Sequence, residues 1–204
     1  MSSISIQNTL VTDLKTDAVV RTSDEGAGRG FGSPPSAFQG ASLRRLEFVC
    51  DSAAPGDTCF AIIAPGVHQK AKYMIHVVGP RRQSLSNREP QLLRSIYMAA
   101  LTLAARNGCR SVGFPLLSVG IFHYPLEGAW RTALRSCCEY FRENPHADLD
   151  VIFASTDERS LDEGRRQMSA LVHESLHGSS ALRSGSGFPV AARRGEGGRL
   201  IIGA

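Results

Sequence analysis

Residues 111–129 read SVGFPLLSVGIFHYPLEGA. The apolar run over 111–117 is typical of a strand, and helical spacing begins at Leu126. Ser118 and Gly120 form the turn between them. A strand that passes through a short Ser/Gly turn into a helix presents backbone N–H groups at the helix N-terminus, where an anion is favourable. The segment therefore predicts an α/β fold with an anion-binding loop directly before Leu126.

Strand and helix patterns alternate on both sides of this segment. Apolar runs predict strands over 3–10, 17–22, 59–64, 72–79 and 149–155, and helical periodicity predicts helices over 36–50, 90–107, 126–142 and 158–176. This alternation indicates an α/β fold with helices on both faces of a sheet.

A second loop has the composition of a phosphate site. Residues 24–36 read DEGAGRGFGSPPS, with four glycines between 26 and 32. Glycines let backbone N–H groups approach a ligand closely. In open α/β sheets, ligands collect where such loops leave the carboxyl ends of strands. Together the two loops would clamp a pyrophosphate, whereas a flexible connection without a ligand remains the alternative for the first loop. Neither a GxxxxGK[ST] nor a GxGxxG pattern is present.

Composition narrows the class of protein. The chain has 204 residues, of which 42% are hydrophobic and 21% charged, and this balance predicts one globular domain. Five cysteines without a CxxC spacing argue against a zinc site and a disulfide framework, so no metal and no cofactor is expected. The sequence shows no signal-peptide pattern and no long apolar stretch, so we expect a cytoplasmic protein that does not span a membrane.

The positive charge is concentrated at the C-terminal end. Residues 177–204 hold four arginines and one glutamate, and so contribute +3 of the formal charge of +4. Because this segment is rich in Gly, Ser and Arg, we expect a body over 1–176 followed by a flexible tail over 177–204. The body is close to neutral, so no specific nucleic-acid partner is expected. A weak phosphate or nucleic-acid contact of the tail is the alternative to a purely solvated one.

Several segments together resemble the macro domain family. They are DAVV (17–20), GDTCFAIIAPG (56–66), AKYMIHVVGP (71–80), the segment 111–129 and VIFASTDE (151–158). Their order and spacing fit that family from about Ser3 to Val172. The resemblance implies a three-layer α/β/α sandwich with a mixed central sheet. It also implies binding of ADP-ribose or a related NAD-derived nucleotide, either free or on an ADP-ribosylated protein.

The resemblance also assigns roles to residues. Asp13 would accept the amino group of adenine, and Arg29 would either neutralise a phosphate or point to solvent. Backbone amides of the two loops would hold the diphosphate and the distal ribose. Those loop positions are Gly28, Gly30, Phe31, Ser118, Val119, Gly120, Ile121 and Phe122.

Three positions depart from the pattern of the hydrolytic members. Asp24 stands where those members have an asparagine, Gly32 stands in place of an aspartate, and Thr156 replaces the aromatic residue that stacks on adenine. An aspartate cannot donate an amide N–H, and a glycine cannot activate a water. His123 replaces a family glycine, and with Asp24 it is the remaining candidate for catalysis. His76 is read as structural.

Three functions therefore stand beside one another. The first is a module that binds ADP-ribose. The second is a hydrolase that removes ADP-ribose from proteins or deacetylates O-acetyl-ADP-ribose. The third is a degenerate macro fold that acts through protein contacts. The backbone loops favour the first function, and the three departures favour the third.

Overall fold

A computed structural model describes residues 2–22, 47–49, 60–66, 70–78, 89–117, 125–177, 191–195 and 198–203. The strands are β1 (Ser2–Asn8), β2 (Ala18–Thr22), β3 (Glu47–Val49), β4 (Phe60–Pro65), β5 (Tyr73–Val78), β6 (Ser111–Pro115), β7 (Asp150–Ser155), β8 (Ala191–Arg194) and β9 (Leu200–Gly203). The helices are the 3-10 turn η1 (Val11–Asp13), α1 (Glu89–Arg106), α2 (Leu126–Glu143) and α3 (Glu158–His177).

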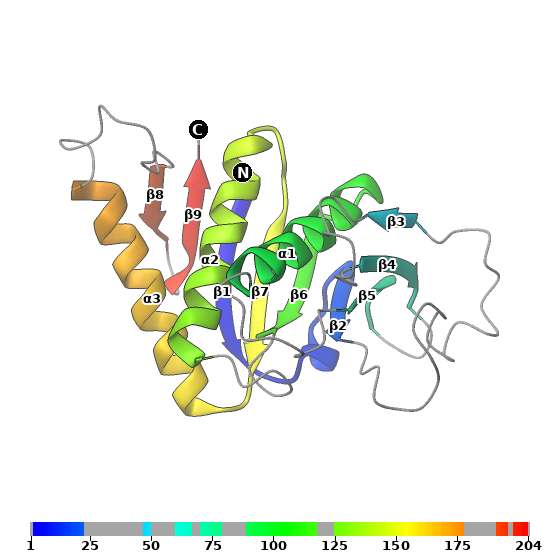
Figure 1. Cartoon of the computed structure of the whole chain (residues 1–204), viewed down its shortest axis with the longest axis horizontal. Coiled ribbons are helices and arrows are strands. Elements are labelled where there is room, and N and C mark those ends of the chain that lie inside the picture. Colours follow the sequence, from blue (N-terminus) through cyan, green and yellow to red (C-terminus); the bar gives the residue numbers. More distant parts are fainter. Residues whose placement is uncertain are drawn as a thin grey trace.

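The described strands form one mixed sheet in the order β3-β4-β5-β2-β6-β7-β1-β9-β8 (Figure 1). The central strands β5, β2, β6, β7 and β1 are parallel. Antiparallel strands flank them on each side, with β3 and β4 beyond β5 and with β9 and β8 beyond β1. The predicted α/β class with a mixed central sheet is confirmed.

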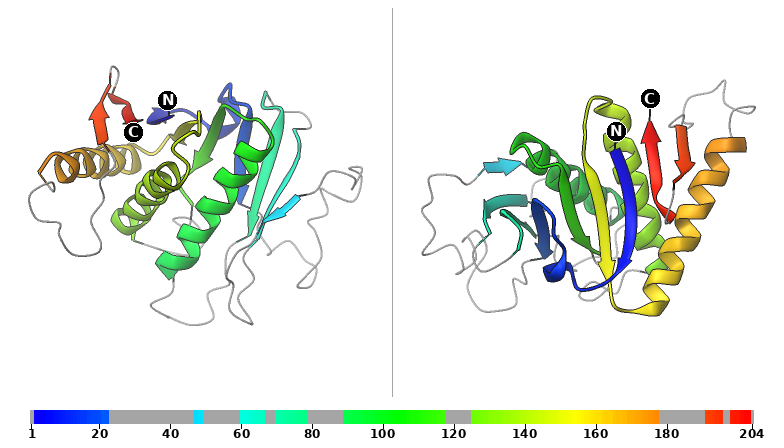
Figure 2. Two further views of the ribbon diagram at one scale, coloured as in Figure 1. Left: turned by 90° about the horizontal axis from the view of Figure 1, so that it is seen from above. Right: turned by 180° about the vertical axis from the view of Figure 1, so that it is seen from behind.

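The three described helices lie on one face of this sheet (Figure 2). The connections β5–α1–β6 and β6–α2–β7 advance in the same direction along the sheet. Because such crossovers are right-handed, both helices reach the same face. Arg94 of α1 ties the two helices together through a bidentate ion pair with Glu139 of α2, at 2.6 and 2.8 Å.

The predicted helix over 36–50 is wrong at its end. Residues 47–49 form strand β3, which pairs with β4 so that Phe48 faces Ile62. The spacing of apolar residues there fits either period, and the neighbouring strand decides between them. The rest of the predicted helix lies outside the described residues.

An aromatic cluster fills the space between the sheet and helices α1 and α2. Tyr97 and Trp130 come from the helices, whereas Phe114 and Phe153 come from neighbouring strands. Ring centroids lie 5.3 to 6.1 Å apart, and all four residues are less than 2% exposed. Burial of each ring contributes about 2–3 kcal/mol, so this cluster is a main source of stability below the carboxyl ends of β6 and β7.

Helix α3 approaches the sheet closely at Gly164. A Cβ atom built on Gly164 would lie 2.8 Å from Ile6 Cδ1 and 2.8 Å from Trp130 Cε2. Such distances are too short for a carbon contact, so the glycine fixes how near α3 can lie to β1 and α2.

The C-terminal segment departs from the prediction. The expectation of a flexible tail over 177–204 is wrong for residues 191–194 and 200–203, which form the hairpin of β8 and β9. Strand β9 pairs antiparallel with β1, with Ser2 opposite Ile202. The alternating run at 200–203 buries Leu200 and Ile202 against the open edge of β1, and this gain outweighs the flexibility of the Gly-rich composition.

Among the described helices, none combines the length and the apolar composition that a membrane crossing requires.

Candidate functional site

The carboxyl ends of the five parallel strands lie along one edge of the sheet. Strand β2 ends at Thr22, directly before the first glycine-rich loop, and β6 ends at Pro115, just before the second. These two strands are hydrogen-bonded neighbours, with Ala18 opposite Val112. Both loops therefore start side by side at the edge where ligands of α/β sheets bind.

Tyr97 fixes the start of the second loop. Its hydroxyl accepts a hydrogen bond from the backbone N–H of Leu117 at 3.2 Å, and Leu117 is 2% exposed. Full burial raises the pKa of the Tyr97 phenol far above its usual value, so the hydroxyl stays protonated. The chain consequently leaves the sheet at a defined point, one residue before Ser118.

Helix α2 begins just after the second loop. Pro125 is its N-cap residue and offers no side-chain acceptor, while its carbonyl accepts the N–H of Ala129 at 2.9 Å. The N–H groups of the first turn thus gain no partner from Pro125 itself. Those groups give the N-terminus of α2 the partial positive charge that favours an anion.

The ends of β1 and β7 are joined at the same edge. Thr9 donates its N–H to the carbonyl of Ser155 at 3.2 Å, and the Asn8 amide donates to the carboxylate of Glu158 at 2.7 Å. Asp157 caps α3 by accepting the N–H of Arg159 at 3.2 Å. Ser155 and Asp157 are therefore engaged in the start of α3, and the exposed Thr156 lies between them.

Leu10 is a surface residue that no sequence pattern singles out. It follows Thr9 directly and is 56% exposed, which is unusual for a large apolar side chain among the described residues. Asp13 lies one 3-10 turn further on, and its carboxylate is 3.4 Å from the Lys70 amine, with both side chains half exposed. Lys70 precedes β5, so this pair points toward the amino ends of the strands. The exposure of Leu10 could be found only from the structure.

The segment that carries Leu10 and Asp13 crosses the sheet at a glycine. A Cβ on Gly113 of β6 would lie 2.6 Å from Leu14 Cδ1 and 3.4 Å from the Thr16 hydroxyl. The missing side chain allows this connection to lie against the sheet.

Asp17 lies at the opposite edge and holds the strands together. Its carboxylate accepts the N–H of Arg110 at 2.9 Å and the Ser111 hydroxyl at 3.3 Å, and it lies 3.0 Å from the Lys72 amine. The hydrogen bond from Arg110, aided by Lys72, holds the pKa of Asp17 below its usual value. The aspartate of DAVV is therefore structural and joins the starts of β2, β5 and β6.

His76 is buried in β5, opposite Arg21 of β2. Burial, together with the charge of Arg21, lowers the pKa of His76 to about 4, so its imidazole is neutral at neutral pH. This placement in the sheet agrees with a structural role.

The described cysteines are not nucleophiles. Cys109, Cys137 and Cys138 are free and buried. Burial raises the pKa of Cys109 to about 11 and that of Cys138 to about 12, and it also raises the pKa of Cys137 well above its usual value. Their thiols therefore stay protonated. Within the described ranges, no three His, Cys, Asp or Glu side chains gather as metal ligands do.

Most of the predicted site residues fall outside the described part of the chain. They are Asp24, Gly28, Arg29, Gly30, Phe31, Gly32, Ser118, Val119, Gly120, Ile121, Phe122 and His123. Their roles remain predictions. The structure places Thr22, which precedes the first loop, and Leu117 and Pro125, which flank the second.

A mixed sheet that brings two glycine-rich loops to one edge defines a class of α/β domain built to hold a small ligand. Comparison with known proteins identifies the family. The Macro domain family matches residues 37–133. A macro domain-containing protein of Mesorhizobium japonicum is 34% identical over 164 residues, which cover 79% of this chain and 90% of that protein. The chain belongs to the macro domain family.

Two further relatives carry names that concern a ligand. An O-acetyl-ADP-ribose deacetylase of Salmonella gallinarum is 31% identical over 133 residues, which cover 64% of this chain and 74% of the relative. The crystal structure of the Trypanosoma brucei macrodomain in complex with ADP-ribose superimposes with a TM-score of 0.55 at 26% identity. The match covers 79% of this chain and 67% of that one.

Proposed function

We propose that this macro domain binds ADP-ribose or a related NAD-derived nucleotide at the carboxyl edge of its sheet. One observation carries the proposal: the glycine-rich loop and the Ser/Gly loop leave from the neighbouring strands β2 and β6, as a clamp on a diphosphate requires. The Trypanosoma brucei macrodomain, which was solved with ADP-ribose, supports this choice of ligand.

The two loops would divide the ligand between them. Gly28, Gly30 and Phe31 would give backbone amides to the diphosphate, with Arg29 as a further cation. Residues 118–122 would hold the distal ribose and the second phosphate, aided by the N-terminus of α2. These contacts come mainly from the backbone, so they tolerate the side-chain departures at Asp24 and Gly32.

The adenine contact has two candidates. Asp13 would accept the amino group of the base, but its carboxylate already lies 3.4 Å from Lys70. Leu10 lies directly at the carboxyl edge and would give the base an apolar surface in place of the ring that Thr156 lacks. Two separate variants, Asp13→Asn and Leu10→Ser, distinguish the two candidates. Only the change at the residue that contacts adenine should lower the affinity for ADP-ribose more than the affinity for ribose 5-phosphate.

Isothermal titration of the full chain with ADP-ribose tests the function. The full chain is needed because the C-terminal hairpin is part of the sheet. We expect a dissociation constant in the micromolar range, about −8 kcal/mol. Gly120→Val should abolish binding because it obstructs the second loop. Ala170→Val places the same β-branched side chain at an exposed position of α3 and should leave binding unchanged. Binding that persists in Gly120→Val would place the nucleotide elsewhere.

Asp24 provides a second test of the same cleft. The carboxylate adds negative charge beside a diphosphate and cannot donate a hydrogen bond. Asp24→Asn should therefore raise the affinity for ADP-ribose. An unchanged or lower affinity would show that this turn does not limit binding.

A hydrolase is the second candidate, because relatives named for ADP-ribose chemistry share much of the chain. They include the Salmonella deacetylase and an ADP-ribose glycohydrolase of Xenopus laevis that is 35% identical over 144 residues. Asp24 and His123 are the side chains that this chain offers for acid–base chemistry. Release of acetate from O-acetyl-ADP-ribose, or of ADP-ribose from a modified protein, would show that the chain is a hydrolase. A folded chain that neither binds nor turns over would leave a degenerate fold that acts through protein contacts.

The proposed ligand suggests a protein partner, and the described cysteines suggest a compartment. An ADP-ribosylated protein would present the same nucleotide to the cleft, and it is the partner we propose. We place the protein in the cytoplasm, since its described cysteines are free thiols.

A further inference from the structure

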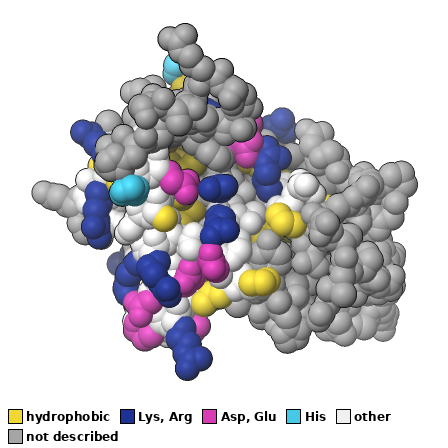
Figure 3. All heavy atoms as spheres, turned by 60° about the vertical axis from the view of Figure 1, so that its left-hand side comes forward, with side chains coloured by type: hydrophobic (Ala, Val, Ile, Leu, Met, Phe, Trp, Pro, Cys, Tyr) yellow, Lys and Arg dark blue, Asp and Glu magenta, His cyan; other side chains and the backbone are white. Residues whose placement is uncertain are grey.

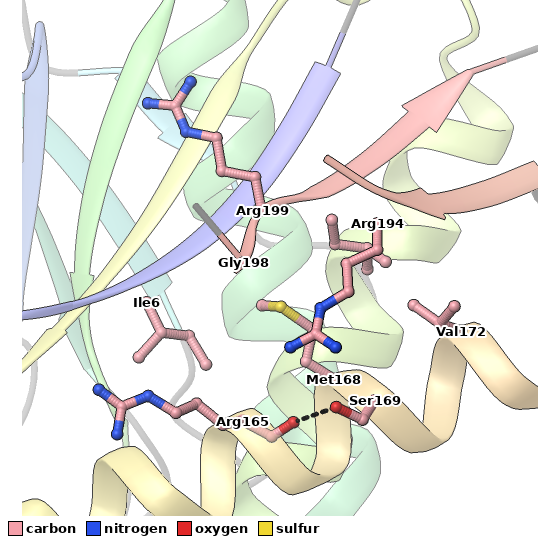
Figure 4. A pocket seen from close by; sticks show the side chains of 9 residues that line it. Ile6, Arg165, Met168, Ser169, Val172, Arg194, Gly198 and Arg199 are labelled. Carbon is pink, nitrogen blue, oxygen red and sulfur yellow. Dashed lines mark hydrogen bonds between the residues drawn. The ribbon is translucent and has the colours of Figure 1, made fainter. Parts of the chain in front are cut away.

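A cavity lies between α3 and the C-terminal hairpin, which adjoins β1 at the far side of the sheet from β2 (Figure 4). Its volume is about 250 Å³. The lining residues come from β1, α3 and the hairpin: Ile6, Arg165, Met168, Ser169, Val172, Arg194, Gly198, Arg199 and Leu200. The hairpin closes one side of the space, so the cavity depends on the segment that the sequence suggested to be a flexible tail.

Part of the lining is apolar. Ile6, Met168, Val172 and Leu200 contribute aliphatic or thioether side chains, and Met168 and Leu200 are buried. Such a surface favours the apolar part of a ligand.

The remaining lining carries three arginines and no carboxylate. In Figure 4 the guanidinium of Arg194 extends toward Met168 and Ser169, that of Arg165 lies on the side of Ile6, and that of Arg199 extends away from the other labelled residues. Arg165 also lies 3.1 Å from Asp162 on its own helix. Among the described residues, no carboxylate lies within ion-pair distance of Arg194, so its guanidinium is the charged group that the described lining directs into the cavity.

The outer face of α3 has a different distribution of charge. Acidic and basic side chains lie next to one another on this side of the molecule (Figure 3). Arg166 pairs with Glu163 at 2.8 Å, and Arg135 pairs with Glu174 at 3.4 Å. The described charges on this face are therefore mixed and partly paired, whereas Arg194 at the cavity has no described carboxylate beside it.

The hairpin holds its two arginines in defined places. The Gly195 N–H donates to the Arg199 carbonyl at 2.8 Å, and Gly198 adopts a φ of 76°, which favours glycine. Arg194 lies opposite Leu200 in the β8–β9 register, and Leu200 in turn lies opposite Ile4 of β1. Arg194 and Arg199 are consequently tied to the sheet through their backbones.

We propose that this cavity binds a small amphiphilic anion, an apolar ring or short chain that carries a phosphate or a carboxylate. The apolar part packs against Met168 and the partly exposed Ile6 and Val172, and Arg194 binds the anionic head. Guanidinium groups suit such heads because they donate parallel hydrogen bonds to two oxygens. The cavity is smaller than the pockets that hold drug-sized ligands, so a dinucleotide does not fit inside it.

Fluorescence titration of the full chain with 1-naphthyl phosphate tests the proposal. 1-Naphthoate carries a carboxylate on the same ring, 1-naphthol lacks the anionic charge, and inorganic phosphate lacks the ring. We expect the naphthyl anions to bind with one-to-one stoichiometry and at least about tenfold more tightly than either partial probe. Raising the salt concentration should lower the affinity for the two naphthyl anions and leave the affinity for 1-naphthol unchanged.

Two variants locate the site. Arg194→Gln should lower the affinity for 1-naphthyl phosphate by about tenfold or more. Arg193→Gln is the matched control, since it makes the same charge change on the same strand at a position that does not line the cavity. We expect it to stay within about twofold of the wild type. Ser169→Trp should abolish binding by filling the cavity.

Several outcomes would overturn the proposal. Equal losses in the two arginine variants would indicate general charge attraction. Equal binding of 1-naphthol would indicate an apolar site only. Binding that survives Ser169→Trp, or that ADP-ribose displaces by competition, would place the probe elsewhere. Absence of binding at millimolar 1-naphthyl phosphate in a folded wild-type chain would reject the site.

Discussion

The hydroxyl of Tyr97 on α1 accepts the backbone N–H of Leu117 at 3.2 Å, at the point where β6 becomes the second glycine-rich loop. Tyr97 also packs its ring on Phe114, with centroids 5.4 Å apart. One side chain therefore belongs both to the core and to the start of the loop. The position of that loop is coupled to the packing of α1 against the sheet.

Replacing Tyr97 by Phe should destabilise the protein and weaken the ligand site together. The ring remains, but the buried N–H of Leu117 loses its acceptor, which costs about 1–3 kcal/mol. Urea denaturation and titration with ADP-ribose would measure the two effects.

Tyr140→Phe is the control for this change, because Tyr140 lies near the far end of α2 from the loop. It should leave affinity unchanged. If Tyr97→Phe binds ADP-ribose with wild-type affinity, the hydrogen bond serves stability alone.

Replacing Asp17 by Asn should lower the free energy of unfolding by about 1–3 kcal/mol, because the charge that Arg110 and Lys72 stabilise is removed. Asp162→Asn, which breaks an exposed pair with Arg165, should cost less than about 1 kcal/mol. The lowered pKa of Asp17 means that its contribution is present above its unfolded pKa and is lost as the pH falls toward the folded value. Equal costs for the two variants would contradict the structural role of Asp17.

His76 should make the protein acid-sensitive. The unfolded chain takes up a proton near pH 6.5, whereas folded His76 does so only near 4. Stability is therefore highest above pH 6.5 and falls as the pH is lowered through this window, by about 1.4 kcal/mol per unit at most. Between pH 7 and 5 the wild type should lose about 2 kcal/mol more than His76→Gln. If the free energies of unfolding of the two proteins change equally with pH, His76 does not take up a proton on unfolding.

Replacing Gly164 by Ala should destabilise the protein, although alanine is the better helix former. The new methyl group would meet Ile6 and Trp130 at 2.8 Å. Overpacking of this kind costs about 1–3 kcal/mol, which exceeds a propensity gain of about 1 kcal/mol. The melting temperature of Gly164→Ala should be compared with that of Ser169→Ala, a control at an exposed position of the same helix. A rise in melting temperature for Gly164→Ala would mean that α3 shifts freely.

The spacing of apolar residues correctly predicted the elements in which that spacing is regular. The helices α1, α2 and α3 begin and end within about two residues of their predicted bounds, because each has a continuous apolar stripe. Strand β9 was missed because its short run takes its stability from β1, at the other end of the chain.

The site shows the same division. Glycine content identified the first loop, and the order of strand, Ser/Gly turn and helix identified the second. The acceptor on Tyr97 could not be predicted, because twenty residues separate it from Leu117 and no local pattern joins them. Leu10 was missed because it lies at the end of the predicted strand over 3–10, where the sequence gives no sign of its exposure.

The pairing of β1 has a consequence for the order of folding. Both neighbours of this strand come late in the chain, with Ser3 opposite Asp150 of β7 and Ile201 of β9. Contacts between such distant segments close large loops and form slowly. Among the described strands β1 is synthesised first, yet both of its edges stay unpaired until nearly all of the described chain has followed. The first of these strands to be made is therefore among the last to be paired, and until then its edges are open to pairing with a neighbouring nascent chain.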